Sequence, residues 1–491
     1  MKTIKLSFLL LFLMLLGVNE GKSFCGFYVA KADAKLFNKS SQVIIVRDGS
    51  RTVITMSNDY QGSAKDFAMV VPVPEVLVRD NIRIADQMVF DKLDAYSGPR
   101  LVEYYDQNPC YQMIYEEEMS MMDMAPRAAG SAERKMKSTA QKYNVTIEAT
   151  YTVGEYDIVI LSAKESDGLK NWLLANEYKI PAAAEEVLAP YIRNEMKFFV
   201  VKVNLEKQKS SGFTTLRPIQ IAFHSDKFML PIRLGMANAE EAQDLVVYAF
   251  SKKGRIETTN YRTVEIPSNK NIPEFIQSEF GEFYVDLFNT AYEKERKRAV
   301  FLEYAWDVSF RNQIKCDPCV GPPPVYNDLR EAGVHWLKNN GGTNVEGDVF
   351  FTRLHLRYDR QNFPQDLFFQ ETPNKSQFQG RYIMQHAVKG NLECDEAQAY
   401  IKGVAKRREK ELHQLANLTG WDISDRYDYV EEFASKVKKS GNDNGWIEPD
   451  FKKGGFFNDF ENGFPFGKLL LIIAAIIFSS GLKMYWNDLK I

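Results

Sequence analysis

An uncharged run near the C-terminus, from Leu469 to Leu482, is the strongest constraint on how this chain of 491 residues can fold. The run alone is too short for a bilayer core, but lysines flank it on both sides and can reach the interface. An ideal helix from Phe466 to Met484 would span roughly 28 Å, close to the hydrocarbon thickness. We therefore predict a transmembrane helix at 466–486 and a short cytoplasmic tail at 487–491. A buried core helix or an interfacial hairpin is the alternative.

The N-terminus has the pattern of a secretory signal peptide. Two lysines precede an apolar stretch from Leu6 to Val18, and Gly21 and Ser23 supply the small residues of a cleavage site. The pattern predicts a signal peptide at 1–23, with an uncleaved anchor as the alternative. Export combined with the C-terminal helix predicts a single-pass protein of the cell membrane. The bulk of the chain would then be extracytoplasmic, either periplasmic or at the cell surface.

The composition is that of a globular protein, with 45% of the residues hydrophobic and 26% charged. These fractions exclude a wholly disordered chain, a collagen-like fibre and a multi-span transporter. The net charge of -3 lacks the basic excess expected of a nucleic-acid binder. The expected partners are therefore the membrane and an unidentified envelope protein, and not a nucleic acid.

The five cysteines point to disulfides, because an exported chain folds in an oxidising compartment. Cys316 and Cys319 form a Cys-x-x-Cys element, and we predict a structural disulfide in a loop. A thioredoxin-like site is disfavoured because the prolines at 322–324 cannot continue a helix. A redox-active pair and half of a metal site are the alternatives. The connectivity of the others stays open: Cys25, Cys110 and Cys394.

Strand and helix patterns interleave along the chain, which predicts an α+β fold with mainly antiparallel sheet and packed amphipathic helices. Val43–Val46 and Thr52–Met56 flank Asp48-Gly49 and predict a hairpin. Apolar stripes predict long helices at Pro273–Arg298 and Glu396–Leu418.

Two further strand pairs are expected, one joining 219–223 to 228–232 and the other joining 245–250 to 261–266. The predicted organisation of the exported part runs in four segments: an α+β domain or domains at 24–390, a Met-rich mobile insertion within it at 115–137, a helical juxtamembrane region at 391–440, and a linker at 441–465.

Four stretches of this sequence together resemble an uncharacterised bacterial family, domain of unknown function 2330. They are Cys25–Phe27 with the hairpin that follows, Phe67–Pro74, Tyr156–Pro181 and Phe351–Leu367. The similarity extends over about 24–372. It implies a bacterial, exported and often membrane-tethered protein without an established activity, and it supplies no catalytic residues.

One strand carries a candidate site. Arg353, His355 and Arg357 alternate with Leu354 and Leu356, so the three polar side chains should share one face. Three cationic or titratable groups in a line could bind an anion such as phosphate or carboxylate. The alternative is a solvated face, or pairing of these side chains with acidic residues on neighbouring strands.

Sequence motifs of catalysis are missing: the chain has no nucleophile elbow, phosphate loop or zinc-protease helix. Clustered methionines at 119–124 could suit Cu(I), but an exposed insertion without a metal role is the simpler interpretation, and we predict no cofactor and no metal. We expect a binding or assembly module of the cell envelope. An exported, hydrolase-like enzyme with a site formed only on folding is the first alternative, and thiol-disulfide chemistry is the second.

Overall fold

The computed structural model describes residues 27–30, 40–57, 66–110, 145–163, 166–176, 184–204, 216–237, 242–312, 316–319, 321–341, 345–390 and 392–437. The predicted signal peptide, Met-rich insertion, linker and transmembrane helix lie outside these ranges. None of the helices within them combines the length and the apolar character needed to cross a membrane.

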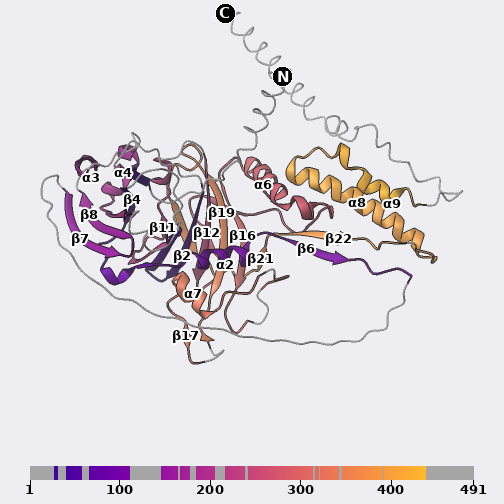
Figure 1. Cartoon of the computed structure of the whole chain (residues 1–491), viewed down its shortest axis with the longest axis horizontal. Coiled ribbons are helices and arrows are strands. Elements are labelled where there is room, and N and C mark those ends of the chain that lie inside the picture. Colours follow the sequence, from indigo (N-terminus) through magenta and orange to yellow (C-terminus); the bar gives the residue numbers. More distant parts are fainter. Residues whose placement is uncertain are drawn as a thin grey trace, which may run out of the picture. The chain divides into compact units, whose positions relative to one another are not determined.

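Two large sheets dominate the described residues (Figure 1). The five-stranded sheet has, in spatial order, β1 (Phe27–Ala30), β4 (Asp66–Val73), β9 (Lys197–Asn204), β8 (Tyr156–Ala163) and β7 (Val145–Val153). The nine-stranded sheet has β14 (Arg262–Glu265), β16 (Ala299–Asp307), β19 (Phe350–Tyr358), β12 (Gln243–Ser251), β2 (Ser40–Asp48), β3 (Arg51–Ser57), β10 (Ile219–His224) and β5 (Ile82–Ile84), with β21 (Phe378–Gln379) beside β16.

Three small sheets complete the β-structure that is described. They are β11 (Met229–Leu230), β20 (Leu367–Glu371) and β13 (Ile256–Thr258); β15 (Lys270–Asn271), β22 (Arg381–His386) and β6 (Arg100–Tyr105); and β17 (Lys338–Asn339) with β18 (Val345–Glu346). Most neighbouring strands are antiparallel. The parallel pairs are β12 with β2, β14 with β16, β15 with β22 and β22 with β6.

Seven α-helices occur in the same ranges: α2 (Met88–Ser97), α3 (Ser166–Ala175), α4 (Ala184–Arg193), α6 (Ile276–Lys294), α7 (Tyr326–Ala332), α8 (Ala397–Thr419) and α9 (Asp428–Ala434). Short 3-10 turns lie at η1 (Arg79–Asn81), η2 (Gly235–Ala237) and η3 (Ser424–Arg426). The mixed α+β class predicted from the sequence is confirmed.

The chain divides into two compact units, one of residues 1–392 with 410–422 and the other of 393–409 with 423–491. In the smaller unit, the guanidinium of Arg408 pairs with Glu432 at 2.6 Å and lies over the ring of Tyr429. Because Arg408 is almost completely buried, these contacts hold α9 against the first part of α8.

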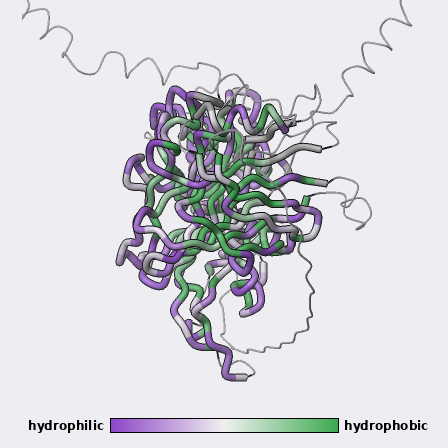
Figure 2. Tube along the Cα trace, turned by 90° about the vertical axis from the view of Figure 1, so that its left-hand side faces the viewer, coloured by the Kyte–Doolittle hydropathy of each residue, from purple (hydrophilic) through white to green (hydrophobic). Residues whose placement is uncertain are grey.

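Successive side chains of a strand point to opposite faces of its sheet, so each large sheet of the larger unit can contribute to an apolar core on either face. One apolar core lies between the two large sheets and contains side chains of both, such as Ile54 and Val201. A second core lies between the nine-stranded sheet and helices α2 and α7, and a third between the five-stranded sheet and helices α3 and α4. Figure 2 shows hydrophobic residues concentrated along the central strands and hydrophilic residues in the outer turns. Both large sheets are thus covered on both faces.

The hairpin predicted around Asp48-Gly49 is confirmed, since β2 and β3 pair antiparallel through seven residue pairs. The two other predicted strand pairs are wrong. The strand β11 pairs with β20 rather than with β10, and β12 lies between β19 and β2 while β14 pairs with β16. Consecutive strands are neighbours in a sheet in roughly two-thirds of cases, and these two pairs are exceptions.

Candidate functional site

The three side chains singled out on β19 do lie on one face of that strand. Leu354 and Leu356 belong to the core between the two large sheets, and Arg353, His355 and Arg357 point away from it, toward helices α2 and α6. The alternation of the strand thus arranges them in the predicted line along the centre of the nine-stranded sheet.

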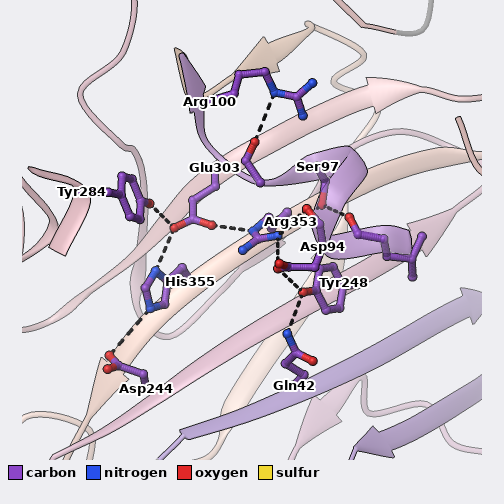
Figure 3. A network of polar contacts seen from close by, with 12 residues as sticks. Gln42, Asp94, Ser97, Arg100, Asp244, Tyr248, Tyr284, Glu303, Arg353 and His355 are labelled. Atoms are coloured by element: carbon purple, nitrogen blue, oxygen red, sulfur yellow. Dashed lines mark hydrogen bonds and ion pairs between the residues drawn. The ribbon is translucent and has the colours of Figure 1, made fainter. Parts of the chain in front are cut away.

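A β-bulge in the neighbouring strand β16 brings a carboxylate to this face. The register between β16 and β19 shifts between Leu302 and Tyr304, so Glu303 is an extra residue between two paired ones. A bulge redirects the side chain at that position. The carboxylate of Glu303 lies between Arg353 and His355 (Figure 3), although the rest of the strand up to Trp306 is uncharged and mainly apolar.

Glu303 is completely buried and accepts three hydrogen bonds. Arg353 Nε donates to one carboxylate oxygen at 2.6 Å, and His355 Nδ1 lies 2.8 Å from the other, which also accepts the hydroxyl of Tyr284. Burial by itself would raise the pKa of this carboxyl. The charges of His355 and Arg353 outweigh that effect and lower the pKa of Glu303 to about 2. Glu303 is therefore ionised at neutral pH.

His355 lies between two carboxylates and against an aromatic ring. Its Nε2 is 3.6 Å from Asp244 on β12, and its ring stacks on Phe288 of α6 with centroids 4.0 Å apart. Burial alone would lower the pKa of His355. The carboxylates of Glu303 and Asp244 outweigh that effect and raise the pKa to about 9. The imidazole is therefore held as a cation, with Nδ1 donating to Glu303 and Nε2 in an ion pair with Asp244.

Arg353 connects this group to helix α2. Its Nη1 donates to Asp94 Oδ1 at 2.7 Å, and its guanidinium lies 5.3 Å from the ring centroid of Tyr248. The Tyr248 hydroxyl donates to the same Asp94 oxygen at 2.7 Å and accepts from Gln42 at 3.1 Å. Arg353 is buried, whereas Asp94 is about half exposed (47% of the side chain), so this end of the group reaches solvent.

Arg357 connects the other end to helix α6. Its Nε and Nη2 donate to the two oxygens of Asp244 at 2.8 and 3.0 Å, and its Nη1 donates to Asn289 at 2.7 Å. Burial would raise the pKa of Asp244, but His355 and Arg357 lower it to about 2. We call the six alternating charges along β19 the ionic chain: Asp94, Arg353, Glu303, His355, Asp244 and Arg357.

The ionic chain is charge-balanced, with three carboxylates and three cations. Each of the three predicted cations therefore has an acidic partner, which was the alternative interpretation of the pattern. Anion binding at these residues stays a prediction, and Arg353 and His355 face carboxylates rather than open space. Arg357 does line a pocket.

That pocket, which we call the polar pocket, has a volume of about 560 Å³. Its lining consists mainly of amide, charged and hydroxyl side chains: Ala242, Asn289, Tyr292, Glu293, Lys297, Arg357, Asp359, Gln361 and Asn362. Tyr292 is buried, and its hydroxyl has no hydrogen-bond partner among the described residues. Burial and the charge of Asp359 raise the pKa of Tyr292 to about 12, so the hydroxyl keeps its proton. The pocket thus offers fixed donors and acceptors that a ligand could use.

Sequence reasoning missed the three carboxylates of the ionic chain. Asp94, Asp244 and Glu303 stand 259, 113 and 50 residues from their partners on β19. The sequence holds one local signal, since Glu303 is the single charge within the apolar run from Ala299 to Trp306. No spacing rule links the two aspartates to β19.

Cys316 and Cys319 are joined by a disulfide in a loop, with Cα atoms 5.1 Å apart. Cys316 is buried and Cys319 is exposed. Cys110 and Cys394 are also disulfide-bonded. In the described part of the chain, no group of three or more His, Cys, Asp or Glu side chains is arranged to hold a metal ion.

Comparison with known proteins identifies one family. The model of the uncharacterized bacterial family DUF2330, described as an uncharacterized protein conserved in bacteria, matches residues 20–370. No curated protein and no solved structure matches the chain. Because the match covers well over half of the sequence, the chain belongs to this family.

Proposed function

We propose that this member of the bacterial family DUF2330 is an exported, membrane-tethered binding module of the cell envelope, and that the polar pocket binds a small, hydroxyl-rich ligand of the saccharide class. Export and tethering rest on the sequence, through the signal peptide at 1–23 and the helix at 466–486. The observation that carries the binding role is the polar pocket itself, in which charges are already paired and a buried hydroxyl is not.

Charge balance favours a neutral ligand over a simple anion. Lys297 pairs with Glu293 at 2.9 Å, and Arg357 is held by Asp244 and Asn289. An anion would have to compete with carboxylates that already occupy these cations, and it would gain little from a lining without net charge. A hydroxyl group can use the unoccupied donor and acceptor positions without displacing an ion pair.

Geometry of the lining favours the same ligand class. Asp359 accepts the backbone N–H groups of Gln361 and Asn362, each at 2.8 Å, so the loop after β19 is fixed by its own hydrogen bonds. Asn289 is fixed by Arg357. Such pre-positioned planar polar groups bind hydroxyls with little ordering cost. The Tyr292 hydroxyl is covered by neighbouring atoms, so a ligand hydroxyl would bond it after a small shift of the lining and would then offset the cost of about 1–3 kcal/mol that a buried group without a partner carries.

The test is calorimetric titration of the full chain with a panel of neutral mono- and disaccharides, with phosphate and citrate as anionic comparators. We expect saturable binding of a neutral sugar that persists at high salt, because no net charge is neutralised. Tyr292→Phe removes only the hydroxyl and should weaken that binding about tenfold. The matched control is Tyr382→Phe, since Tyr382 is also buried with a hydroxyl that lacks a partner in the described residues but lies on β22.

Two results would contradict the saccharide proposal. One is the absence of sugar binding by folded protein. The other is phosphate or citrate binding that Arg357→Gln abolishes, which would support the anion site instead. Tethering is tested separately, by fractionating cells and exposing spheroplasts to a protease. Degradation of the bulk of the chain without lysis is expected, and protection of the bulk would refute the proposed orientation.

A further inference from the structure

A second pocket, unlike the polar one, lies where the two large sheets meet. It has a volume of about 360 Å³, within the range of small-molecule sites. Strands of both sheets form its walls, with Ile54 of β3, Ile221 of β10 and Val71 of β4 among the side chains that line it. These three are all at least 97% buried, so the pocket reaches into the core between the sheets. We call it the apolar pocket.

The walls and the rim of the apolar pocket differ in chemistry. Inside, methionine, proline and phenylalanine side chains add to the aliphatic walls. At the rim lie Asn194, Asp226 and Lys227, all exposed, with the ammonium of Lys227 3.4 Å from the Asn194 side-chain oxygen. An apolar space offers water too few hydrogen bonds and takes up apolar groups instead. A polar rim of both charge signs accommodates a polar head group.

One buried carboxyl fixes the wall that helix α4 contributes. Asp366 accepts a hydrogen bond from the Tyr191 hydroxyl at 2.6 Å and another from the backbone N–H of Arg233 at 3.1 Å. Burial raises the pKa of Asp366. Tyr191 is thereby held at the pocket, so its shape is set before any ligand arrives.

We propose that the apolar pocket binds the chain of a single-tailed amphiphile, an unbranched alkyl or acyl chain whose polar head lies at the rim formed by Asn194, Asp226 and Lys227. The inference is independent of the saccharide site, because the two pockets share no residue. A free fatty acid, a fatty alcohol and an alkylamine share the chain that the pocket would bind and differ in the head.

The experiment is photo-crosslinking of the full chain in membranes with a fatty acid that carries a diazirine at the end of its tail. Crosslinks mapped by peptide mass spectrometry should concentrate on pocket segments, namely 54–56, 71–74, 190–196 and 221–231. An excess of the unlabelled fatty acid should displace the probe, and parallel competition by the alcohol and the amine would identify the head that the rim prefers. Labelling confined to segments outside the pocket would overturn the proposal.

A filling variant and its matched control separate pocket binding from general membrane contact. Met196, half-buried at the pocket, is changed to Trp, and Met88, exposed on α2, is changed to Trp as the control. Met196→Trp should lower labelling of the pocket segments about tenfold, and Met88→Trp should leave it unchanged. Equal labelling of both variants would refute the site. If Met196→Trp fails to fold, displacement in the unaltered chain decides, since labelling that excess fatty acid does not reduce also refutes it.

Discussion

Raising the pH from about 6 to about 9.5 should reduce the free energy of unfolding by up to about 3 kcal/mol through loss of the His355 proton. Burial disfavours the charged ring, but Glu303 and Asp244 raise the pKa of His355 from 6.5 to about 9. That rise is worth about 3 kcal/mol, at roughly 1.4 kcal/mol for each tenfold change in proton affinity. Only 14% of the side chain is exposed, so solvent screens little of it.

The sign follows from linkage. The folded pKa lies above the unfolded one, so the folded state holds the proton more tightly. The stabilisation is complete below pH 6.5, declines as the pH rises, and is lost once the pH passes through about 9. Tyrosines begin to titrate near the upper end of this window, so the two effects are separated by comparison with the His355→Gln variant, which keeps every tyrosine.

The assay is equilibrium urea denaturation of the full chain, followed by tryptophan fluorescence at intervals across this pH window. The His355→Gln variant should be less stable than the unaltered chain at pH 6 and should lose most of the pH dependence. The control is His413→Gln, because His413 is exposed on α8. An identical decline in stability with pH in the His355→Gln variant and the unaltered chain would refute the assignment of the decline to the ionic chain.

Four other variants test the structure by urea or thermal denaturation. Glu303→Gln should cost about 3–5 kcal/mol, because two buried cations lose their shared counter-charge. Gly333→Ala should cost more than about 1 kcal/mol, since φ is +104° and the new Cβ would lie 2.7 Å from a valine methyl of β3. Gly281 lies on α6 with open space around the position of a new Cβ, so Gly281→Ala should stabilise the protein by up to about 1 kcal/mol. Replacing both Cys316 and Cys319 by Ser should cost about 2 kcal/mol, the loop-closure value for so short a loop.

Local patterns predicted the elements of this fold better than their partners. The helix predicted at 396–418 corresponds to α8, and the strand predicted to carry Arg353, His355 and Arg357 corresponds to β19. Both segments carry a long, regular apolar pattern, which can be recognised within the segment itself without knowing what it packs against. The wrong strand pairs at 245–250 and 261–266 assumed that neighbours in sequence are neighbours in the sheet. Strand order depends instead on which apolar faces fit, and that is a property of the whole domain.

The candidate site divides along the same line. The sequence correctly predicted that Arg353, His355 and Arg357 share one face, because successive side chains of any β-strand point to opposite faces. It could not supply their partners. Glu303 reaches the face through a bulge, which breaks the alternation that the prediction used, and Asp244 comes from a different strand.

A line of ion pairs is a costly way to fill a sheet-helix interface, since apolar residues of similar size often give equal or greater stability. Ion pairs differ from apolar contacts in that each one joins two defined positions. Arg353 joins β19 to Asp94 of α2, and Arg357 joins the same strand to Asn289 of α6. These contacts fix the positions of α2 and α6 relative to β19, one near each end of the ionic chain. The polar pocket lies at the α6 end, so its geometry should depend on charges far inside the sheet, and a ligand there would report on the whole ionic chain.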